Sequence, residues 1–510
     1  MNGRIRRLGL AFAVLYVVLF VQLNRVQFFG AERLQEHSIN SRGLIRDFGQ
    51  ERGSIISADG VVIARSVEIG EPVDFRREYP EGDLYAHIAG YQSLNVAATG
   101  LERIYNDELA GVTVEQQFRT FAGLFSDLDT TATLHLTIRD DVQRAAREAL
   151  GDRRGSVVAL DPRTGAVVAL WTWPSFDPNL LADPDGSVAN AAFEAYLNDS
   201  SDPLLAKSYR ELFFPGSTFK LVTAAAGLES AMIGAFAPEF AIADTYNPIP
   251  GGSPIRNFAG GSCGGNLVEV LRVSCNTAFA EMGAEWVGPE QMIETAELFG
   301  FNQLPPIDLP NAATSRFPVD YGIRLADVDF YRGGEDVILV NGAVGVYENS
   351  ARLAQTSIGH NDVAATPLQM ALVAAAIANN GQIMVPYVVQ ELTGADGTSY
   401  QITKERLWRQ AMRLSSADVL RAAMVEVAVN GTARNMAVDG LMVGGKTGTA
   451  QLGTDPPNSH AWIIGFAGTG DGVPELAIAV IVEAQEGASE QTGGAVAAPI
   501  ARAVIEAYFS

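Results

Sequence analysis

The sequence predicts an α+β fold in which helices flank an antiparallel sheet, and two strand pairs with helices between them carry the prediction. The first pair, at 156–160 and 166–172, surrounds Asp161-Pro162-Arg163-Thr164-Gly165, whose turn chemistry indicates a hairpin. The second pair, at 460–467 and 476–483, is joined through 468–474. Helical patterns between the pairs fit a helical insertion in one sheet. They run over 220–230, 289–298 and 367–378, and a terminal helix is expected over 497–508.

A smaller domain is expected ahead of this sheet. Residues 52–56 and 59–64 are predicted to form a strand, a turn and a strand, and the amphipathic pattern of 140–150 predicts a helix. The glycine-rich stretch 251–265 is predicted to be a loop. The expected division is a tail at 1–7, a membrane anchor at 8–29, an N-terminal domain at 30–150 and a C-terminal domain at 151–510.

The N-terminus predicts the compartment. Arg4, Arg6 and Arg7 precede an apolar run over 8–23, and 26–30 extends it towards the roughly 20 residues that span a bilayer. Basic residues ahead of a span place the N-terminus inside the cell. A cleaved signal peptide is the alternative, but no A-x-A-like site follows the run. The sequence therefore favours a single-pass protein of the plasma membrane whose domains lie outside the cytoplasm.

Composition excludes several classes of function. The formal net charge of −23 leaves no basic patch that would neutralise phosphates, so nucleic acid is not an expected partner. The five histidines show no metal-ligand spacing, and no phosphate-binding loop or dinucleotide fingerprint occurs. We therefore expect neither a metal nor another cofactor.

Lysine is scarce, and two of the four lysines lie in patterns with chemical meaning. The chain has thirty-two arginines, so its positive charge is almost wholly guanidinium. A buried lysine amine can lose its proton beside another cation, whereas an arginine stays protonated. Lys220 and Lys446 are the candidates for chemistry, and Lys207 and Lys404, which match no motif, are expected at the surface.

Ser217 is the candidate nucleophile. Phe214-Pro215-Gly216-Ser217 indicates a stop followed by a helix start, which puts Ser217 in the first turn and Lys220 one turn later on the same side. The hydroxyl then reaches the amine beside the free N–H groups of a helix N-terminus. A surface serine with a solvated lysine is the alternative, because S-x-x-K often arises by chance.

Two further patterns follow in the chain. Ser274-Cys275-Asn276 can turn a hydroxyl and an amide towards one site, or one of the two side chains can simply cap the next helix. In Lys446-Thr447-Gly448-Thr449, Gly448 is expected to leave room for the backbone of a ligand. An edge strand with a solvated lysine is the alternative for this segment.

The two cysteines, Cys263 and Cys275, lie on the side of the membrane where thiols oxidise. A bond between them would close a small loop and contribute roughly 3 kcal/mol in the chain-entropy model. Two free, partly buried thiols are the alternative, since the sequence supplies no geometry.

In the order S-x-x-K, S-x-N and K-T-G, these motifs are a signature of penicillin-binding proteins and serine β-lactamases. The chain resembles that superfamily from Arg52 onward, and specifically its short, PbpA-type class B penicillin-binding proteins. Further segments that look like that family's motifs are Arg52-Gly53, Gly100-Leu101-Glu102 with Tyr105, Asp161-Pro162, 174–179, 366–368 and His460-Ala461-Trp462. No segment resembles a glycosyltransferase domain.

The resemblance implies a peptidoglycan D,D-transpeptidase that β-lactams inhibit, with a pedestal or dimerisation domain before the transpeptidase domain. Ser217 would attack the bond between the last two D-alanines of a stem peptide, with Lys220 as its base and Ser274 passing a proton to the leaving amine. Asn276 would hold the substrate amide. The remaining substrate-binding residues would be Lys446, Thr447, Gly448 and Thr449, and the N–H groups of Ser217 and Thr449 would form an oxyanion hole. Besides stem peptides, the implied partners are a membrane glycan polymerase and division or elongation proteins.

Two other functions remain open. A β-lactamase or β-lactam sensor shares the acylation chemistry, but the deacylation motif E-x-x-L-N occurs at 194–198, before Ser217, where we interpret it as a helix end. A sensor would also need a signalling segment inside the cell, and only a few residues precede the predicted anchor. An envelope scaffold with an idle site is the third reading, and the intact Ser217, Lys220 and Lys446 weigh against it.

Overall fold

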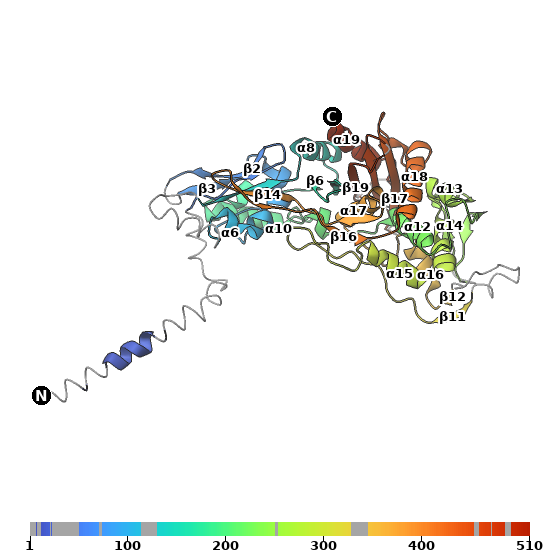
Figure 1. Cartoon of the computed structure of the whole chain (residues 1–510), viewed down its shortest axis with the longest axis horizontal. Helices are drawn as coiled ribbons and strands as arrows, with labels where there is room; N and C mark the ends of the chain where they lie inside the picture. The colour runs from blue at the N-terminus through green and yellow to red at the C-terminus, as the bar shows by residue number, and fades with distance from the viewer. Residues whose placement is uncertain are drawn as a thin grey trace.

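Two large β-sheets form the framework of the molecule (Figure 1). The computed structural model describes residues 7, 12–20, 22, 50–70, 74–113, 130–249, 253–327, 345–452, 458–470, 472–484 and 491–510. Of the predicted anchor at 8–29, residues 12–20 are helical, and most of the remainder lies outside the described residues, as does the tail at 1–6. No described helix is both long and apolar enough to cross a membrane.

The C-terminal sheet has five antiparallel strands in the order β17-β18-β19-β5-β6. The two predicted pairs are β5 (Gly155–Leu160) with β6 (Val167–Trp173), and β18 (Ser459–Gly468) with β19 (Leu476–Val482). They meet through β19 and β5, and β17 (Met442–Gln451) adds the edge strand. The α+β prediction is confirmed for this sheet, which brings the third motif to its edge.

Helices cover the sheet where the apolar patterns predicted them. Helix α17 (Pro367–Ala378) is buried along its whole length and packs against β5, β18 and β19. Thr366 caps it by accepting a hydrogen bond from the Gln369 N–H, and Pro367 fits the first turn because its missing N–H is not needed there. Helix α8 (Asp140–Leu150) packs against β6 and against α19 (Ala497–Phe509).

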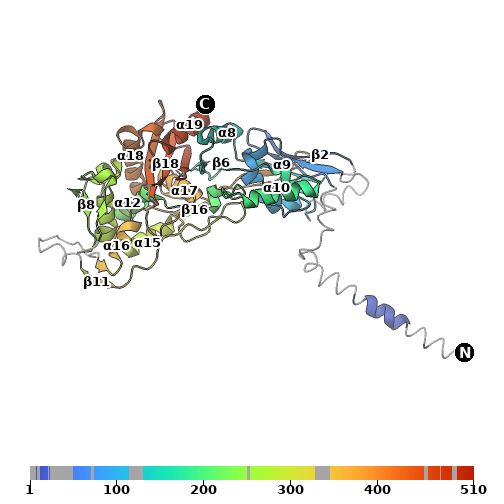
Figure 2. The same cartoon turned by 180° about the vertical axis from the view of Figure 1, so that it is seen from behind.

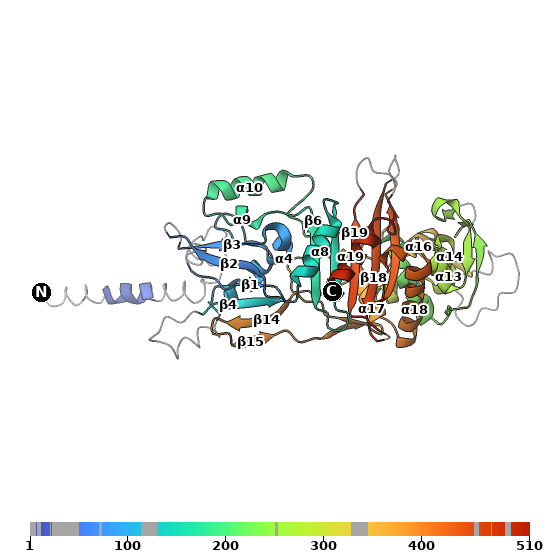
Figure 3. The ribbon, with the colours of Figure 1, turned by 90° about the horizontal axis from the view of Figure 1, so that it is seen from above.

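The N-terminal sheet has six strands in the order β15-β14-β4-β1-β2-β3, and Figure 3 shows them side by side. The predicted strand, turn and strand are β1 (Ile55–Ile56) and β2 (Val62–Glu68), followed by β3 (Phe75–Glu78) and β4 (Ala132–Leu136). The remaining hairpin, β14 (Val389–Gly394) with β15 (Ser399–Ile402), comes from far along the chain. The sheet thus combines strands from both sides of the boundary expected at 150.

A segment beyond that boundary also packs on the N-terminal lobe. The Asn179 side chain bonds the backbone of Tyr79 twice, each time at 2.9 Å. Helix α10 (Gly186–Asn198) follows and lies beside the N-terminal strands (Figure 2). It contains the E-x-x-L-N letters, with Glu194 and Asn198 exposed at its C-terminal end, as interpreted from the sequence.

Two predictions are wrong in this part of the molecule. Lys207 is not a surface residue, because its side chain is buried and its Nζ lies 2.9 Å from Glu483 Oε1 and 3.3 Å from Glu211 Oε2. The stretch 251–265 is not simply a loop. It contains the short strands β9 (Ile255–Arg256) and β10 (Cys263–Gly265), which pair with β8 (Thr245–Tyr246) and β7 (Phe240–Ala243). Lys404 is exposed, as expected.

Candidate active site

Ser217 lies in a tight turn and lines a pocket of about 800 Å³. The turn is a 3-10 helix, Gly216–Phe219, that leads into α12 (Lys220–Glu229), so the predicted helix start is present with a tighter first turn. Gly216 begins it at φ +53°, a conformation that favours glycine, and its N–H donates to the Gly359 carbonyl at 3.0 Å. These contacts fix the backbone that carries the Ser217 hydroxyl.

Lys220 is completely buried behind this turn. Its Nζ donates to the Ser274 carbonyl and to Asn276 Oδ1, both at 2.7 Å, and lies 3.3 Å from Ser274 Oγ. Among the described contacts of Lys220 there is no hydrogen bond to Ser217, so the structure does not show the predicted contact between the hydroxyl and the amine. Burial, and then the charge of Lys446, holds the pKa of Lys220 well below its usual value.

Three oxygens surround Lys220 Nζ, and the third, Ser274 Oγ at 3.3 Å, can either accept from an ammonium or donate to a neutral amine. The lowered pKa of Lys220 favours the neutral amine. A lysine ammonium has three donors and no acceptor, whereas a neutral amine has two N–H groups and a lone pair. The Ser274 carbonyl and Asn276 Oδ1 accept two hydrogens at short range. The lone pair of a neutral Lys220 is then free to accept a proton from a hydroxyl.

Lys446 approaches the same point from β17. Its side chain is also completely buried, which excludes the solvated lysine considered above, and its Nζ donates to Ser274 Oγ at 2.8 Å and to the Thr447 carbonyl at 2.8 Å. Burial lowers the pKa of Lys446 to about 7. Burial lowers the pKa of both lysines, and the charge of the neighbouring lysine lowers only that of Lys220 further, so Lys446 is the better candidate to carry the charge.

Ser274 joins the two lysines. It has a φ of +60°, which a non-glycine residue rarely adopts and which is typical of functional sites. Helix α13 (Leu267–Arg272) ends just before it, and α14 (Asn276–Glu281) starts just after it. This sharp turn between two helices places the hydroxyl within hydrogen-bonding distance of both amines. Neither Ser274 nor Asn276 caps α14 with its side chain, so the alternative of a simple helix cap is wrong.

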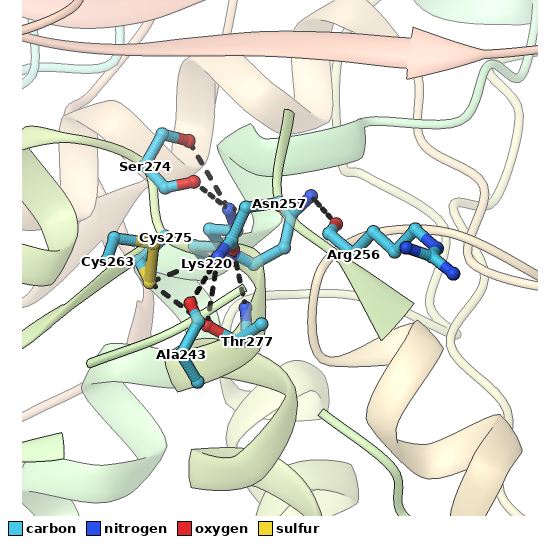
Figure 4. The surroundings of a disulfide bond; sticks show 9 residues. Lys220, Ala243, Arg256, Asn257, Cys263, Ser274, Cys275 and Thr277 are labelled. Atoms are coloured by element: carbon cyan, nitrogen blue, oxygen red, sulfur yellow. Dashed lines mark hydrogen bonds between the residues drawn. A yellow bond between two sulfur atoms is a disulfide. The ribbon is translucent and has the colours of Figure 1, made fainter. Parts of the chain in front are cut away.

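A disulfide and a buried asparagine hold this turn (Figure 4). Cys263 and Cys275 are bonded, with an S–S distance of 2.08 Å, which decides the alternative left open by the sequence. Asn257 Oδ1 accepts from the N–H groups of Asn276 and Thr277 at 2.9 and 3.0 Å and so caps α14. Sequence reasoning missed Asn257, because no local pattern connects it to α14.

The third motif presents its threonines to the pocket. Thr447 and Thr449 line it, and Thr447 Oγ1 donates to Thr432 Oγ1 at 2.7 Å. The role expected of Gly448 differs in the structure. A Cβ there would lie 2.9 Å from the Pro215 carbonyl, so the space beside Gly448 is filled by the turn that carries Ser217 rather than kept for a ligand.

Several residues that line the pocket could not be recognised as site residues from the sequence. They come from segments that only the fold brings together, and include His360, Thr432, Gly493, Gly494 and the arginines 256, 272 and 434. The structure thus places all three motifs around one pocket, with both lysines behind its wall.

Comparison with known proteins identifies the family. A profile described as "Penicillin binding protein transpeptidase domain" matches residues 155–506, and one described as "Penicillin binding protein A dimerisation domain" matches residues 52–133. The chain belongs to the penicillin-binding protein family. The first profile covers the five-stranded sheet and its pocket, and the second covers β1 to β3 and part of β4.

Relatives within the family match over the full length. Peptidoglycan D,D-transpeptidase PbpA of Mycolicibacterium smegmatis is 37% identical, and PbpA of Mycobacterium tuberculosis is 35% identical, each match covering 99% of both chains. A structure of penicillin-binding protein A from M. tuberculosis as a ceftriaxone acyl-enzyme complex superposes with a TM-score of 0.79 at 34% identity. That match covers 91% of this chain and 100% of the other.

Proposed function

We propose that this protein is a serine-type peptidoglycan D,D-transpeptidase that cross-links stem peptides and is acylated by β-lactams. One observation carries the proposal: Ser274 Oγ lies within hydrogen-bonding distance of Lys446 Nζ and Lys220 Nζ, behind a pocket that Ser217 lines. Relatives of the same length are peptidoglycan D,D-transpeptidases, and the M. tuberculosis protein forms acyl-enzymes with β-lactams.

In acylation, Ser217 Oγ attacks the carbonyl between the last two D-alanines of a stem peptide. Its proton passes to the neutral Lys220 amine, whose pKa is depressed and whose lone pair is free. Ser274 gives its hydroxyl proton to the departing D-alanine amine and regains one from a lysine ammonium beside it. An amine of a second stem peptide then takes the acyl group, and the proton steps run in reverse.

Lys446, Thr447 and Thr449 bind the terminal carboxylate in this proposal. A carboxylate that arrives next to Lys446 favours its charged form, so substrate binding raises a pKa that burial has lowered to about 7. Strand β17 is a sheet edge, and an edge strand can pair with a peptide through its backbone. The N–H of Thr449 and the N–H of Ser217 form the oxyanion hole.

The lifetime of the acyl-enzyme distinguishes a transpeptidase from a β-lactamase and from an idle scaffold. A transpeptidase retains a penicillin adduct for many minutes, and the Ser217→Ala variant takes up none. Rapid turnover of penicillin would identify a β-lactamase, although the described residues that line the pocket include no carboxylate for deacylation. A folded protein that never labels would identify an idle scaffold.

The proposal includes a location at the outer face of the plasma membrane, beside a glycan polymerase and division or elongation proteins. Its support is the charge pattern of Arg4, Arg6 and Arg7 before the apolar run at 8–23. Protease added to intact spheroplasts should digest the transpeptidase domain. Protection of that domain until the membrane is lysed would contradict this location.

A further inference from the structure

The pocket is positively charged in a strongly acidic protein. The chain carries 59 aspartates and glutamates against 36 lysines and arginines. Even so, the described residues that line the pocket include Arg256, Arg272 and Arg434 and no aspartate or glutamate. Such a concentration of one sign of charge attracts and orients ligands of the opposite sign.

These three arginines have no partner within the described part of the chain. Several arginines elsewhere hold carboxylates, as in Arg144 with Asp140 at 2.6 Å and Arg413 with Glu229 at 3.0 Å. The guanidinium groups of Arg256, Arg272 and Arg434, in contrast, make neither a salt bridge nor a side-chain hydrogen bond to any described residue. Because arginine has five donors in a planar fork, each can hold a carboxylate.

Contacts of the backbone fix the positions of these arginines around the pocket. Asn276 Nδ2 donates to the Arg256 carbonyl at 2.9 Å, and the Arg256 side chain extends away from Lys220 and Asn257 (Figure 4). Arg272 lies two residues before Ser274, and its carbonyl accepts from the Thr432 N–H at 3.4 Å. Arg434 follows Thr432 in the next turn, so Arg272 and Arg434 belong to segments that meet at one side of the pocket.

The terminal carboxylate of a stem peptide does not account for three arginines. That group already has Lys446, Thr447 and Thr449 in the proposed function, on which the present inference rests. We infer that Arg256, Arg272 and Arg434 bind additional carboxylates of the peptide substrates and make the enzyme selective for stem peptides that carry them. The carboxylate belongs either to the donor stem or to the acceptor stem, and two assays separate these sources.

The donor assay uses two β-lactams that differ by one carboxylate. Carbenicillin carries a carboxylate on its acyl side chain, and benzylpenicillin lacks it. The readout is the ratio of their second-order acylation rate constants in the full-length protein. Arg256→Gln, Arg272→Gln and Arg434→Gln each remove a charge, and at least one should lower the ratio by about tenfold, the value of a hydrogen bond to a charged group.

The acceptor assay uses amino-acid acceptors with a free or an amidated α-carboxylate. Its readout is the ratio of acyl transfer to hydrolysis. Replacement of an arginine that serves the acceptor by glutamine should lower this ratio for the acceptor with the free carboxylate and leave it unchanged for the amidated one. The matched control is Arg406→Gln, since Arg406 is exposed and lies outside the pocket. High salt should reduce the same ratios in the parent protein, because salt screens exposed charges.

The outcomes are distinct. Parent protein that fails to label with benzylpenicillin would refute the proposed function itself. Ratios that stay within twofold of the parent in all three variants and in both assays, while benzylpenicillin still labels, would overturn only the inference about additional carboxylates. An equal loss for both β-lactams would overturn it too, because the arginine would then serve the carboxylate that the two antibiotics share.

Discussion

Replacement of Lys220 by arginine tests whether the lysine acts as a base or only as a charge. The side chain is completely buried, and its Nζ lies 2.7 Å from two acceptor oxygens. A lysine of ordinary pKa would be neutral in only about one molecule in two thousand at pH 7. Burial and the charge of Lys446 lower the pKa of Lys220, which favours the neutral amine that the proposed base requires.

Lys220→Arg puts a permanent positive charge in place of the proposed neutral base, because a guanidinium stays protonated. General-base catalysis typically contributes about 10²- to 10⁴-fold, so acylation should fall by about 10³-fold. The assay is the second-order rate of labelling with a fluorescent penicillin, with the melting temperature as a check on folding. In the parent, the rate should also fall as the pH drops below the pKa of Lys220, since the amine then becomes protonated.

Two further variants test whether a loss of labelling in Lys220→Arg results from misfolding. Lys220→Met fills a similar volume without a base, and it should remain folded and unlabelled. Lys404→Arg makes the same chemical change at an exposed lysine and should label like the parent. Lys220→Arg that labels within threefold of the parent rate would refute the assignment of Lys220 as the base.

Three other predictions concern the supports of the site. The pKa of Lys446 is about 7 in the fold against its usual 10.5, so the unfolded chain binds more protons between these values and parent stability rises with pH. Lys446→Met should lack the share of this rise that comes from Lys446, roughly 4 kcal/mol between pH 7 and 10.5. Urea unfolding that gives the same increase in the free energy of unfolding for the parent and the variant would contradict this. Loss of the disulfide in Cys263→Ser/Cys275→Ser should lower stability by roughly 3 kcal/mol and slow acylation, and an unchanged melting temperature would count against it. In Gly359→Ala, a Cβ would lie 2.0 Å from the Gly216 carbonyl at a φ of +76°, so labelling should fall at least about tenfold through displacement of the turn, and a parental rate would show that the turn tolerates the shift.

Prediction from the sequence succeeded where the determinants are local. Helices α8, α15 (Pro289–Leu298) and α17 begin and end as predicted, because periodicity and starting residues such as Pro289 and Pro367 lie within each segment. The three motifs also lie around one pocket as expected, but that expectation rests on the resemblance to a known family and not on local pattern.

Prediction failed where the determinants are distant in sequence. Lys207 matches no motif and is therefore expected at the surface, but it is buried beside Glu483, which lies 276 positions away in the sequence. The backbone of Ser274 could not be read as left-handed from Ser274-Cys275-Asn276 alone, because two helices and the disulfide impose that turn. The pocket arginines had no signal either, since charge becomes informative only when the fold shows which charges lack partners.

The late hairpin β14–β15 has a consequence for the order in which the chain folds. Strand β4 pairs with β1 on one side and with β14 on the other, although β14 begins more than 250 residues after β4. Until residues near 400 arrive, β4 is an unprotected edge with open hydrogen-bonding groups, and closing so long a loop is slow. The first domain to emerge during synthesis is therefore among the last to be completed, and the nascent chain depends on protection from aggregation over that interval.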